Sequence, residues 1–503
     1  MYKPTLGKTT FSRRDMLRFS SLFALGAGVA LNHRAKAQAA DPELASKLHV
    51  LNRLSWGTRP EDLQKINELG IAGYIEWQLN PETIADPLLD EFLQANPVLL
   101  ANEKDMRASA EENYDNLNIP ALWGRIYRTV YSEKQLYEKV VDFWTDHFNI
   151  PIPDLLVDKV LDDRNVVRTH AMGKFRDLLF ASAKSPAMLI YLDNASSHKD
   201  HPNENYAREI LELHTLGVNG GYSEQDIKEI ARAFTGWTLR DNWEGRFFFD
   251  HDIHDDGEKM VLGQHLAAGR GIEDGLQVLD ILATHPSTAY FISYKLCRRF
   301  VSDFPPEDLV NAVTQVFIDT GGDIRNLLRY IFTSEAFMAS ARQKFRRPLE
   351  AVAAMMRAVG PSLKVNDPGA VFHWLDLMGN LPYHWFPPNG YPDATGAWLN
   401  TNGLLQRWNT AMILAYTSQG WTDGQITLDL SAVIPSASTV QELISVTSKH
   451  LLGYELSAED QEQLVFFVSD YGDPNQVVDD ALRNDRLPTL IGLILSSPSF
   501  QWG

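Results

Sequence analysis

Hydrophobic residues recur at helical spacing along most of this chain. Apolar positions three and four residues apart are typical of amphipathic helices, and the clearest runs are 44–54, 136–148, 175–191, 227–237, 276–300 and 309–337. Strand-like alternation is scarce, and we pair its one candidate, residues 245–249, with residues 260–262 in a hairpin. The sequence therefore predicts a mostly α fold, a large multi-helical and multi-lobed unit with a small β-hairpin insertion near residues 245–265.

A weak internal repeat runs through this helical pattern. An apolar stripe followed by a serine occurs with the same offsets at 175–188, 324–337 and 487–500, and each serine stands where it would cap the next helical turn. We interpret 286–338 and 440–501 as related three-helix units, with chance likeness between amphipathic helices as the alternative. We divide the chain into a main helical domain at 40–345 and a C-terminal helical lobe at 346–503.

The first 39 residues have the pattern of a twin-arginine signal peptide. Arg13 and Arg14 precede an apolar run at 19–31 and then small residues, so we place the cleavage after Ala39, with Ala37 as the alternative. A membrane anchor would need about 20 consecutive apolar residues, which this run does not reach. We therefore expect export by the twin-arginine translocase, a periplasmic or secreted protein, and no stable membrane span.

Charge and cysteine content exclude several classes of protein. The net charge is −19, and the predicted signal peptide holds seven basic residues against one acidic residue, so the rest of the chain carries −25. Such a chain repels phosphate backbones and anionic lipids, so we expect neither nucleic acid nor a membrane surface as a partner. Cys297 is the single cysteine, so a disulfide framework is impossible. We interpret it as a buried small hydrophobe rather than a reactive thiol.

The densest polar sequence lies at 201–217, between a proline that starts a helix and a glycine that ends it. At about 100° per residue, one stripe of this helix carries an amide, an arginine and two carboxylates: Asn205, Arg208, Glu209 and Glu212. His214 lies on the opposite side. One interpretation is a solvated face on which Arg208 pairs with the glutamates four residues away. The other is an arginine held between carboxylates in a groove, where it orients a substrate or shifts the pKa of a carboxyl group.

Two further segments offer candidate ligands. His147 ends an acidic helix, where a histidine is either structural, because its charge suits the helix dipole, or part of a site. The turn at 250–257 holds two histidines and four aspartates, a donor set that suits a divalent metal ion. Its spacing fits no standard metal motif, so an acidic turn is the alternative. His254 and Asp255 are the candidate metal ligands.

A long irregular stretch at 383–398 is rich in aromatic rings. Long loops in compact domains are usually functional, and such rings form flat surfaces that stack on sugars or peptides. The alternative is a loop attached to the helices by its own rings. The sequence contains no glycine-rich phosphate loop, dinucleotide fingerprint, haem-attachment motif or Gly-x-Ser-x-Gly elbow. Nucleotide-dependent, haem c and α/β-hydrolase functions therefore lose support.

Together these motifs resemble a bacterial exported family catalogued as domain of unknown function 1800. The likeness covers nearly the whole chain after the signal and rests on the polar helix, its continuation at 220–223 and 231–237, and the segments 51–57, 143–148, 254–259, 285–289 and 390–393 with Trp398. The resemblance implies an exported and mostly helical protein. It also implies a candidate partner, because members are often encoded beside a second exported family that resembles sulfatases. It implies no activity.

Two functions fit these observations. The first is an extracytoplasmic enzyme, a metal-assisted hydrolase of a glycan or ester, with a polar pocket lined by His147, Glu204, Arg208, Glu209, Glu212, His254 and Asp255. Glu209 or Glu212 would act as the acid or base, and Arg208 would hold the substrate. His254 and Asp255 would bind a divalent metal ion. The second is a non-catalytic periplasmic binding or assembly partner of a co-exported protein. Convergence of the seven side chains in one cavity favours the enzyme, and their dispersal favours the partner.

Overall fold

The protein is built almost entirely of helices. The computed structural model describes residues 41–240, 246–469 and 472–503. The predicted signal peptide at 1–39 lies outside the described residues. Within them the predicted mostly α fold is confirmed, and the strands form only small two-stranded sheets.

Most of the helices follow one another with short connections. The first group is α2 (Pro42–Leu54), α3 (Pro60–Leu79), η1 (Pro81–Thr83), α4 (Pro87–Ala95), η2 (Pro97–Leu100), α5 (Glu103–Glu112), α6 (Asp115–Tyr131), α7 (Gln135–His147), α8 (Leu156–Asp162), η3 (Asp163–Val167) and α9 (Arg168–His170). The second is α10 (Phe175–Ala183), α11 (Pro186–Tyr191), η4 (Asn194–Ser196), α12 (Glu204–Glu209), η5 (Ile210–His214), α13 (Glu224–Ala233), η6 (His251–Ile253), α14 (Glu273–Thr284), α15 (Pro286–Phe300), α16 (Glu307–Thr320), α17 (Ile324–Phe332) and α18 (Glu335–Met338). The third is α19 (Pro348–Val359), η7 (Gly360–Ser362), α20 (Gly369–Leu377), α21 (Thr395–Trp398), α22 (Thr401–Tyr416), η8 (Thr417–Gln419), α23 (Leu430–Val433), α24 (Val440–Leu452), α25 (Ala458–Val468), α26 (Asp480–Ser496) and α27 (Pro498–Gln501).

The strands pair differently from our prediction. β1 (Trp237–Leu239) pairs antiparallel with β2 (Phe247–Phe249), and β3 (Lys259–Val261) pairs with β4 (Gln264–Leu266). The predicted pairing of 245–249 with 260–262 is therefore wrong. The reason for this difference is local. Leu262 and Gly263 both have positive φ, and two such residues form a tight hairpin turn, which joins β3 to the strand directly after it. An unpredicted third pair joins β5 (Leu363–Val365) to β6 (Ile426–Leu428).

Two large hydrophobic cores organise the helices. Core 1 gathers buried residues between Val50 and Phe337, and Cys297 lies in it, fully buried as predicted. Burial raises the pKa of this thiol to about 12. Core 2 gathers buried residues between Leu349 and Phe500, and it also receives Trp56 from the N-terminal part of the chain. The two cores therefore meet along α2, which gives Leu48 to core 2 and Val50, Leu51 and Leu54 to core 1.

The predicted repeat appears as similar helix patterns. Three helices and a short fourth make up both α15–α18 and α24–α27. Ser185, Ser334 and Ser497 each stand at the N-cap of a short helix, as predicted. A common origin of these units stays a prediction, as does the division of the chain at 345/346.

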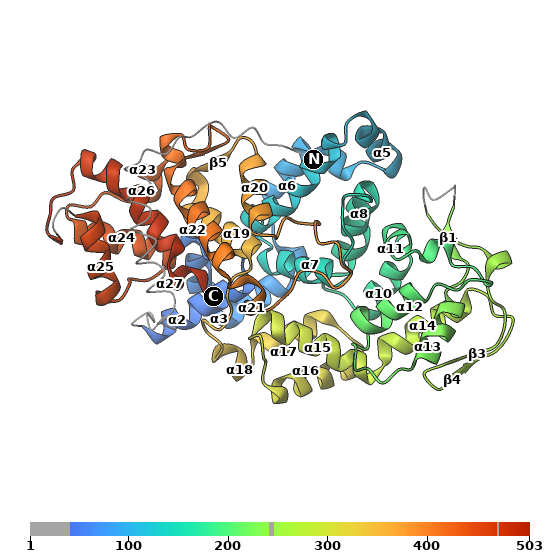
Figure 1. The fold of residues 1–503 in the computed structure, drawn as a ribbon. Helices are drawn as coiled ribbons and strands as arrows, with labels where there is room; N and C mark the ends of the chain where they lie inside the picture. The colour runs from blue at the N-terminus through green and yellow to red at the C-terminus, as the bar shows by residue number, and fades with distance from the viewer. Residues whose placement is uncertain (1–40, 241–245, 470–471) are drawn as a thin grey trace.

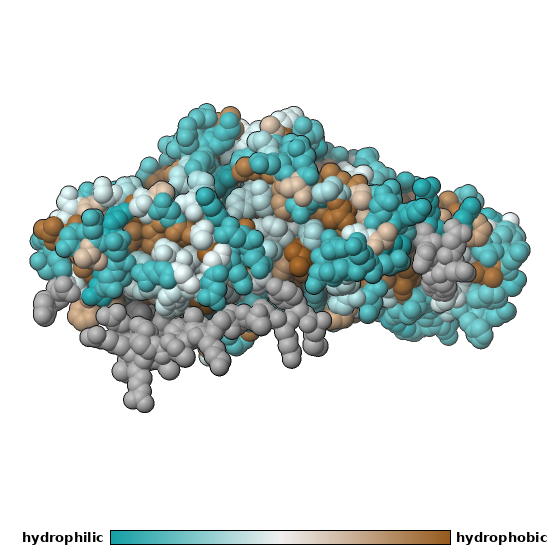
Figure 2. Space-filling view, turned by 90° about the horizontal axis from the view of Figure 1, so that it is seen from above, coloured by the Kyte–Doolittle hydropathy of each residue, from teal (hydrophilic) through white to brown (hydrophobic). Residues whose placement is uncertain are grey.

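The molecule is elongated (Figure 1). α7 lies near its middle, α22–α27 lie at one end, and β1–β4 lie at the other. Figure 2 shows one face on which hydrophilic residues predominate and hydrophobic ones form separate patches. None of the helices in the described part of the chain combines the length and the apolar character that crossing a bilayer requires.

Candidate functional site

The polar helix predicted at 201–217 is an α-helix that changes into a π-helix. Asn203 caps it by accepting hydrogen bonds from the backbone N–H groups of Asn205 and Tyr206. α12 then ends at Glu209, and the next turn, η5, is π-helical. His214 at the end of this turn is buried and packs against Phe148 of core 1. π-turns are frequent at functional positions, and this one was not predicted.

The charged side of this helix faces solvent. Arg208 makes a bidentate pair with Glu224, at 2.9 and 3.0 Å, and lies 3.7 Å from Glu212. The Arg208 side chain is 36% exposed and that of Glu224 is 70% exposed. Glu204 is exposed and Glu209 is half-buried. Burial, followed by the charge of Glu212, raises the pKa of Glu209. The arrangement corresponds to the solvated face with ion pairs.

His147 is buried and contacts a half-buried lysine that the sequence analysis did not identify. Lys295 Nζ donates to His147 Nδ1 at 2.8 Å, so His147 is neutral and its Nε2–H donates to the His214 carbonyl oxygen at 3.0 Å. His147 is 1% exposed. Burial, followed by the charge of Lys295, holds the pKa of His147 well below its usual value. Burial also lowers the pKa of Lys295 to about 8.

The two candidate metal ligands form hydrogen bonds with other residues of the protein. His254 is buried, and its Nδ1 lies 2.7 Å from the Thr235 carbonyl oxygen. Asp255 accepts two hydrogen bonds from Arg232, at 2.7 and 3.1 Å. The Lys259 ammonium donates to the carbonyl oxygens of Asp255 and Gly257 and to the Asp274 carboxylate of α14. Across 41–240, 246–469 and 472–503, no three His, Cys, Asp or Glu side chains are gathered as a metal site would need. Metal binding at His254 and Asp255 stays a prediction.

The aromatic stretch at 383–398 covers the end of α7. Gly390 packs so closely that a Cβ there would lie 2.0 Å from the Asp146 carbonyl oxygen. Asn149 donates to two loop carbonyl oxygens, both at 2.8 Å. Tyr391 contacts the rings of Trp385 and Trp398. The loop is thus attached by both its backbone and its own rings, next to His147.

An ion-pair network, which we call the seam, joins the two cores. Lys139, Asp142 and Asp146 lie on one face of α7 because they are three and four residues apart. Asp142 is the centre of the seam and accepts hydrogen bonds from three arginines, Arg125 of α6, Arg299 of α15 and Arg347. Arg347 precedes α19, whose third residue, Glu350, accepts from the Arg347 backbone N–H at 3.1 Å. The seam thus ties α6, α7, α15 and α19 together.

Burial and charge act in opposite directions on the carboxylates of the seam. Burial favours the protonated form of Asp142, but its three arginines outweigh burial and hold the pKa of this carboxyl below its usual value. For Asp146 burial dominates, and its pKa rises to about 6 although Arg347 opposes the shift. Burial also acts on Glu350, yet Lys139, Arg299 and Arg347 keep its pKa well below the usual value.

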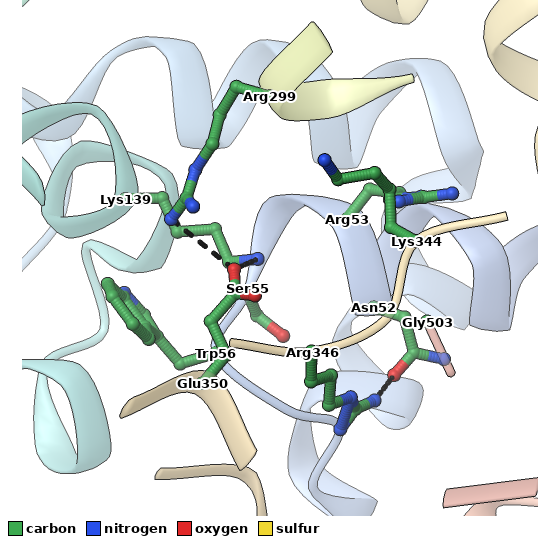
Figure 3. Close-up of a pocket in the computed structure, with 10 residues that line it drawn as sticks. All are labelled: Asn52, Arg53, Ser55, Trp56, Lys139, Arg299, Lys344, Arg346, Glu350 and Gly503. Atoms are coloured by element: carbon green, nitrogen blue, oxygen red, sulfur yellow. Dashed lines mark hydrogen bonds and ion pairs between the residues drawn. The ribbon is translucent and has the colours of Figure 1, made fainter. Parts of the chain in front are cut away.

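A small cavity, which we call the basic cavity, opens beside the seam (Figure 3). It leaves about 20 Å³ for the centre of a water-sized molecule and is lined by Asn52, Arg53, Ser55, Trp56, Lys139, Arg299, Lys344, Arg346, Glu350 and Gly503. Five of these residues have basic side chains, and one, Glu350, has a carboxylate side chain. Figure 3 shows Lys139 and Arg299 both directed at Glu350, with Arg346 directed at Asn52.

Three buried N–H donors around the basic cavity lack an acceptor. Within the described residues, Arg53 Nε, Trp56 Nε1 and Arg346 Nη1 have no hydrogen-bond partner. Arg53 is 4% exposed, Trp56 1% and Arg346 9%. An unsatisfied buried donor is costly, and each one in a native protein requires an explanation. The wall of this cavity therefore has donors to spare.

A second and larger cavity lies beside α8. It has a volume of about 380 Å³ and is lined mainly by residues of α5, α8, η3 and β2, among them Asp158, Asp162 and Arg164. These charged groups already have partners in the protein, because Arg107 binds Asp158, Lys159 and Ser185 bind Asp162, and backbone carbonyl groups bind Arg164. Neither cavity is lined by any of the seven residues predicted for the polar pocket.

The residues of the basic cavity were missed individually, although signals for them exist. The run Lys344-Phe345-Arg346-Arg347-Pro348-Leu349-Glu350 places three cations directly before a helix start. Three segments of the family resemblance supply residues in or beside this cavity. Segment 51–57 supplies Arg53 and Trp56, which line it. Segment 143–148 supplies Asp146, which pairs with Arg347, and segment 390–393 supplies Asp393, which pairs with Lys344 at 3.3 Å. The signal in the sequence was thus the density of charged and aromatic residues in these motifs.

The comparisons with known proteins agree with the resemblance. The family described as "Protein of unknown function (DUF1800)" matches residues 49–502, which is nearly all of the described chain. No functionally curated protein and no solved structure matches. The match includes α7, α15 and the segment 344–350, and so the whole of the seam. The chain therefore belongs to the DUF1800 family.

Proposed function

We propose that this protein is exported by the twin-arginine route and works outside the cytoplasm as a non-catalytic binding protein for an anionic ligand. The ligand site is the basic cavity. The observation that carries the proposal is the gathering of three buried, unpartnered N–H donors on one cavity wall. Donors without acceptors suit a ligand that only accepts hydrogen bonds, and an anion is such a ligand.

The charge on the wall supports the same function. Lys139 pairs with Glu350, Arg299 with Asp142, and Lys344 with Asp303. Arg53 and Arg346 form no ion pair with the described residues; Arg53 donates to the Ser340 carbonyl oxygen, and Arg346 donates to Asn52 and lies over the Phe500 ring. Buried cations are normally paired, because removing a charge from water is expensive. A bound anion would supply the missing partner.

Binding of anions by the purified protein tests the proposal. We expect saturable binding of at least one small anion in isothermal titration calorimetry, weakened at least tenfold by Arg53→Met and unchanged by Arg176→Met. Arg176 is the matched control because it is 45% exposed and lies outside the cavity. Ion chromatography of the supernatant after acid denaturation would identify a ligand that is retained from the native source. If no anion binds saturably, the proposal is wrong.

The export step has a separate test. The double variant Arg13→Lys, Arg14→Lys removes the paired arginines of the predicted signal while keeping its charge. We expect the unprocessed chain to accumulate in the cytoplasm of the variant, as detected by cell fractionation and by the mass of the protein. Unchanged export would contradict the twin-arginine route and leave the cavity proposal untouched.

A second candidate function, an enzyme, is favoured by the contact between Lys295 and His147. An amine 2.8 Å from a neutral imidazole, without an ion pair to any described carboxylate, is an arrangement that catalysis uses. Hydrolysis of glycan and ester substrates that Lys295→Met abolishes, without loss of anion binding, would support it. Elemental analysis of protein from its native compartment, and of His254→Ala, tests the predicted divalent metal ion. Co-purification with a sulfatase-like exported protein tests the predicted partner.

A further inference from the structure

The larger cavity beside α8 holds an arrangement of side chains that anion binding does not use. The inference drawn from it rests on the second candidate function, an enzyme, and gives that enzyme a reaction site away from Lys295. Three features of the cavity bear on it: a departure from the predicted repeat, a chain of buried hydrogen bonds, and the composition of the wall.

The predicted repeat shows which hydrogen bond its serine forms in a purely structural role. Ser334 and Ser497 each donate the Oγ hydrogen to the backbone carbonyl oxygen three residues earlier, at 2.8 and 2.7 Å. Ser185 stands at the same position before its short helix, and its backbone N–H donates to the carbonyl oxygen three residues earlier, as in the other two copies. Its Oγ, however, donates to the Asp162 carboxylate at 2.7 Å. The Ser185 hydroxyl group thus binds a carboxylate where the other two copies bind a carbonyl group.

The Asp162 carboxylate is held in place by a lysine. Asp162 is the last residue of α8, and its Oδ2 accepts from the Lys159 ammonium at 3.0 Å. The Lys159 side chain is 0% exposed, and that of Asp162 is 2% exposed. A hydroxyl group within about 2.6–3.2 Å of a base, with a third group that orients the base, is the arrangement that activates a nucleophile. Ser185, Asp162 and Lys159 form this arrangement in that order.

This chain of hydrogen bonds ends at a cavity that is large enough for a substrate. Ser185 and Asp162 both line the cavity, and its volume of about 380 Å³ lies within the roughly 300–1,000 Å³ of small-molecule sites. α8 and α11, which begins directly after Ser185, lie side by side (Figure 1). The π-helix η3 starts directly after Asp162 and contributes to the same wall. Because π-turns are frequent at functional positions, this geometry also indicates a site.

The rest of the wall suits an ester. Leu161, Val166 and Phe247 give it apolar surface, and Arg164 and Asn165 add side-chain N–H groups. Such donors stabilise the negative oxygen that forms when a hydroxyl group attacks a carbonyl carbon. An ester is cleaved more easily than an amide by a hydroxyl group and a carboxylate, because an alcohol leaves more readily than an amine.

We propose that Ser185 is a catalytic nucleophile that hydrolyses a carboxylic ester, with Asp162 as its general base and Lys159 as the positioning residue of Asp162. Ser185 Oγ forms a bond to the carbonyl carbon as its proton passes to Asp162, and the alcohol leaves with that proton as the ester C–O bond breaks. Water then attacks the acyl group on Ser185 and gives a proton to Asp162, which passes it to Oγ as the acyl bond breaks. The products are one alcohol and one carboxylic acid, and the side chains return to their starting state.

Labelling of the purified protein with a fluorophosphonate, which bonds covalently to activated serines and releases fluoride, tests the nucleophile directly. We expect mass spectrometry of the peptides to find the label on Ser185. Ser334 and Ser497 are matched controls from the other two copies of the repeat and should carry none, and protein unfolded in urea should not be labelled. Label on another residue, or no label, would overturn the proposal.

Hydrolysis of para-nitrophenyl butyrate gives a second criterion. Ser185→Ala and Asp162→Asn should each lower kcat/KM at least about 100-fold, and Ser334→Ala should leave it unchanged. Lys159→Met should lower kcat about tenfold or more and change KM less than about twofold, because Lys159 acts on the base and does not touch the substrate. Unchanged hydrolysis in Ser185→Ala would overturn the proposal. Labelling of the wild type decides the test if a variant fails to give the circular dichroism spectrum of the folded protein.

The outcomes separate this proposal from the others. Hydrolysis that Lys295→Met abolishes and Ser185→Ala does not would keep the second candidate function and overturn this site. The absence of both label and hydrolysis would overturn the site and leave anion binding untouched, because the two cavities share no lining residue. Hydrolysis that depends on Ser185 would favour the enzyme over a purely non-catalytic protein.

Discussion

Of all replacements of a carboxylate by its amide in the seam, Asp142→Asn should destabilise the protein most. The substitution keeps the shape of the side chain but removes the charge that Arg125 and Arg299 contact at 2.6 and 3.0 Å, and that Arg347 also contacts. Removing one partner of a buried pair costs about 3–5 kcal/mol. Each arginine keeps a second carboxylate within 3.6 Å, namely Glu138, Glu350 or Asp146. We therefore expect the lower end of the range, about 3 kcal/mol.

Urea unfolding of both the wild type and the variant measures this loss. Asp280→Asn is the matched control, because the Asp280 side chain is 48% exposed and its partner Arg176 is 45% exposed. An exposed pair contributes at most about 1 kcal/mol. The range expected for exposed pairs is about 1 kcal/mol. If the unfolding free energies of the two variants differ by less than this, Asp142 is not the centre of a stabilising ion-pair network.

The pH dependence of the same pair adds a second criterion. Because the arginines lower the pKa of Asp142 in the folded state, its contribution to stability is present above the pKa of the unfolded chain and is lost as the pH falls through the folded pKa. The difference in unfolding free energy between wild type and Asp142→Asn should thus be largest at neutral pH. It should narrow below about pH 4, the usual value for an aspartate. A constant difference from pH 7 to pH 3 would contradict the assignment.

Three further predictions follow from the site. Anion affinity, measured by calorimetry, should be steady from pH 6 to 7.5 and fall above the pKa of Lys139, which burial lowers to about 8 although Glu350 opposes the shift; burial also lowers the pKa of Arg53, to about 9. An affinity that stays unchanged up to pH 9.5 would show that neither group takes part. Gly390→Ala should lose about 3 kcal/mol or more in urea unfolding, because φ is +68° and the new Cβ would lie 2.0 Å from a carbonyl oxygen of α7, whereas Gly396→Ala, which meets nothing within 4 Å, should be neutral or slightly stabilising. Arg208→Met should change the unfolding free energy by less than about 1 kcal/mol, since its pairs are exposed; a larger loss would place this helix among the buried elements.

Sequence periodicity predicted the helices because their apolar stripes are local. The stripe of α17, for example, places Ile324, Leu327, Leu328 and Ile331 on one side, and all four are fully buried. The same reasoning could not predict η5, because a π-turn changes the 3.6-residue period on which it depends. It also mispaired β2 and β3, since a tight turn at Leu262 and Gly263 depends on backbone angles rather than on hydrophobic alternation.

The site was predicted less well because its contacts are distant in sequence. Asp142 meets residues 17, 157 and 205 positions away, and no local pattern shows which arginine reaches it. The polar helix was predicted to hold a site because it has a high density of charged residues. That density does not distinguish an exposed helix face from a buried one. His147 was identified as a candidate, but the lysine beside it lies 148 positions further along the chain.

The seam and the basic cavity have one physical origin. Two hydrophobic cores that meet through charged helix faces need an ion-pair network whose geometry fixes how they dock, and Asp142 supplies its centre. The segment that links the cores, residues 339–347, carries Lys344, Arg346 and Arg347 into this junction. Lys344 and Arg347 pair with carboxylates there, whereas Arg346 contacts Asn52 and the Phe500 ring. Binding of an anion there is therefore linked to docking of the cores. A ligand at 100 times its Kd would add about 2.7 kcal/mol to the unfolding free energy. Part of that added stability should be lost whenever the cores separate. A binding site built from the surplus charge of a junction would report ligand occupancy through the stability of the junction itself.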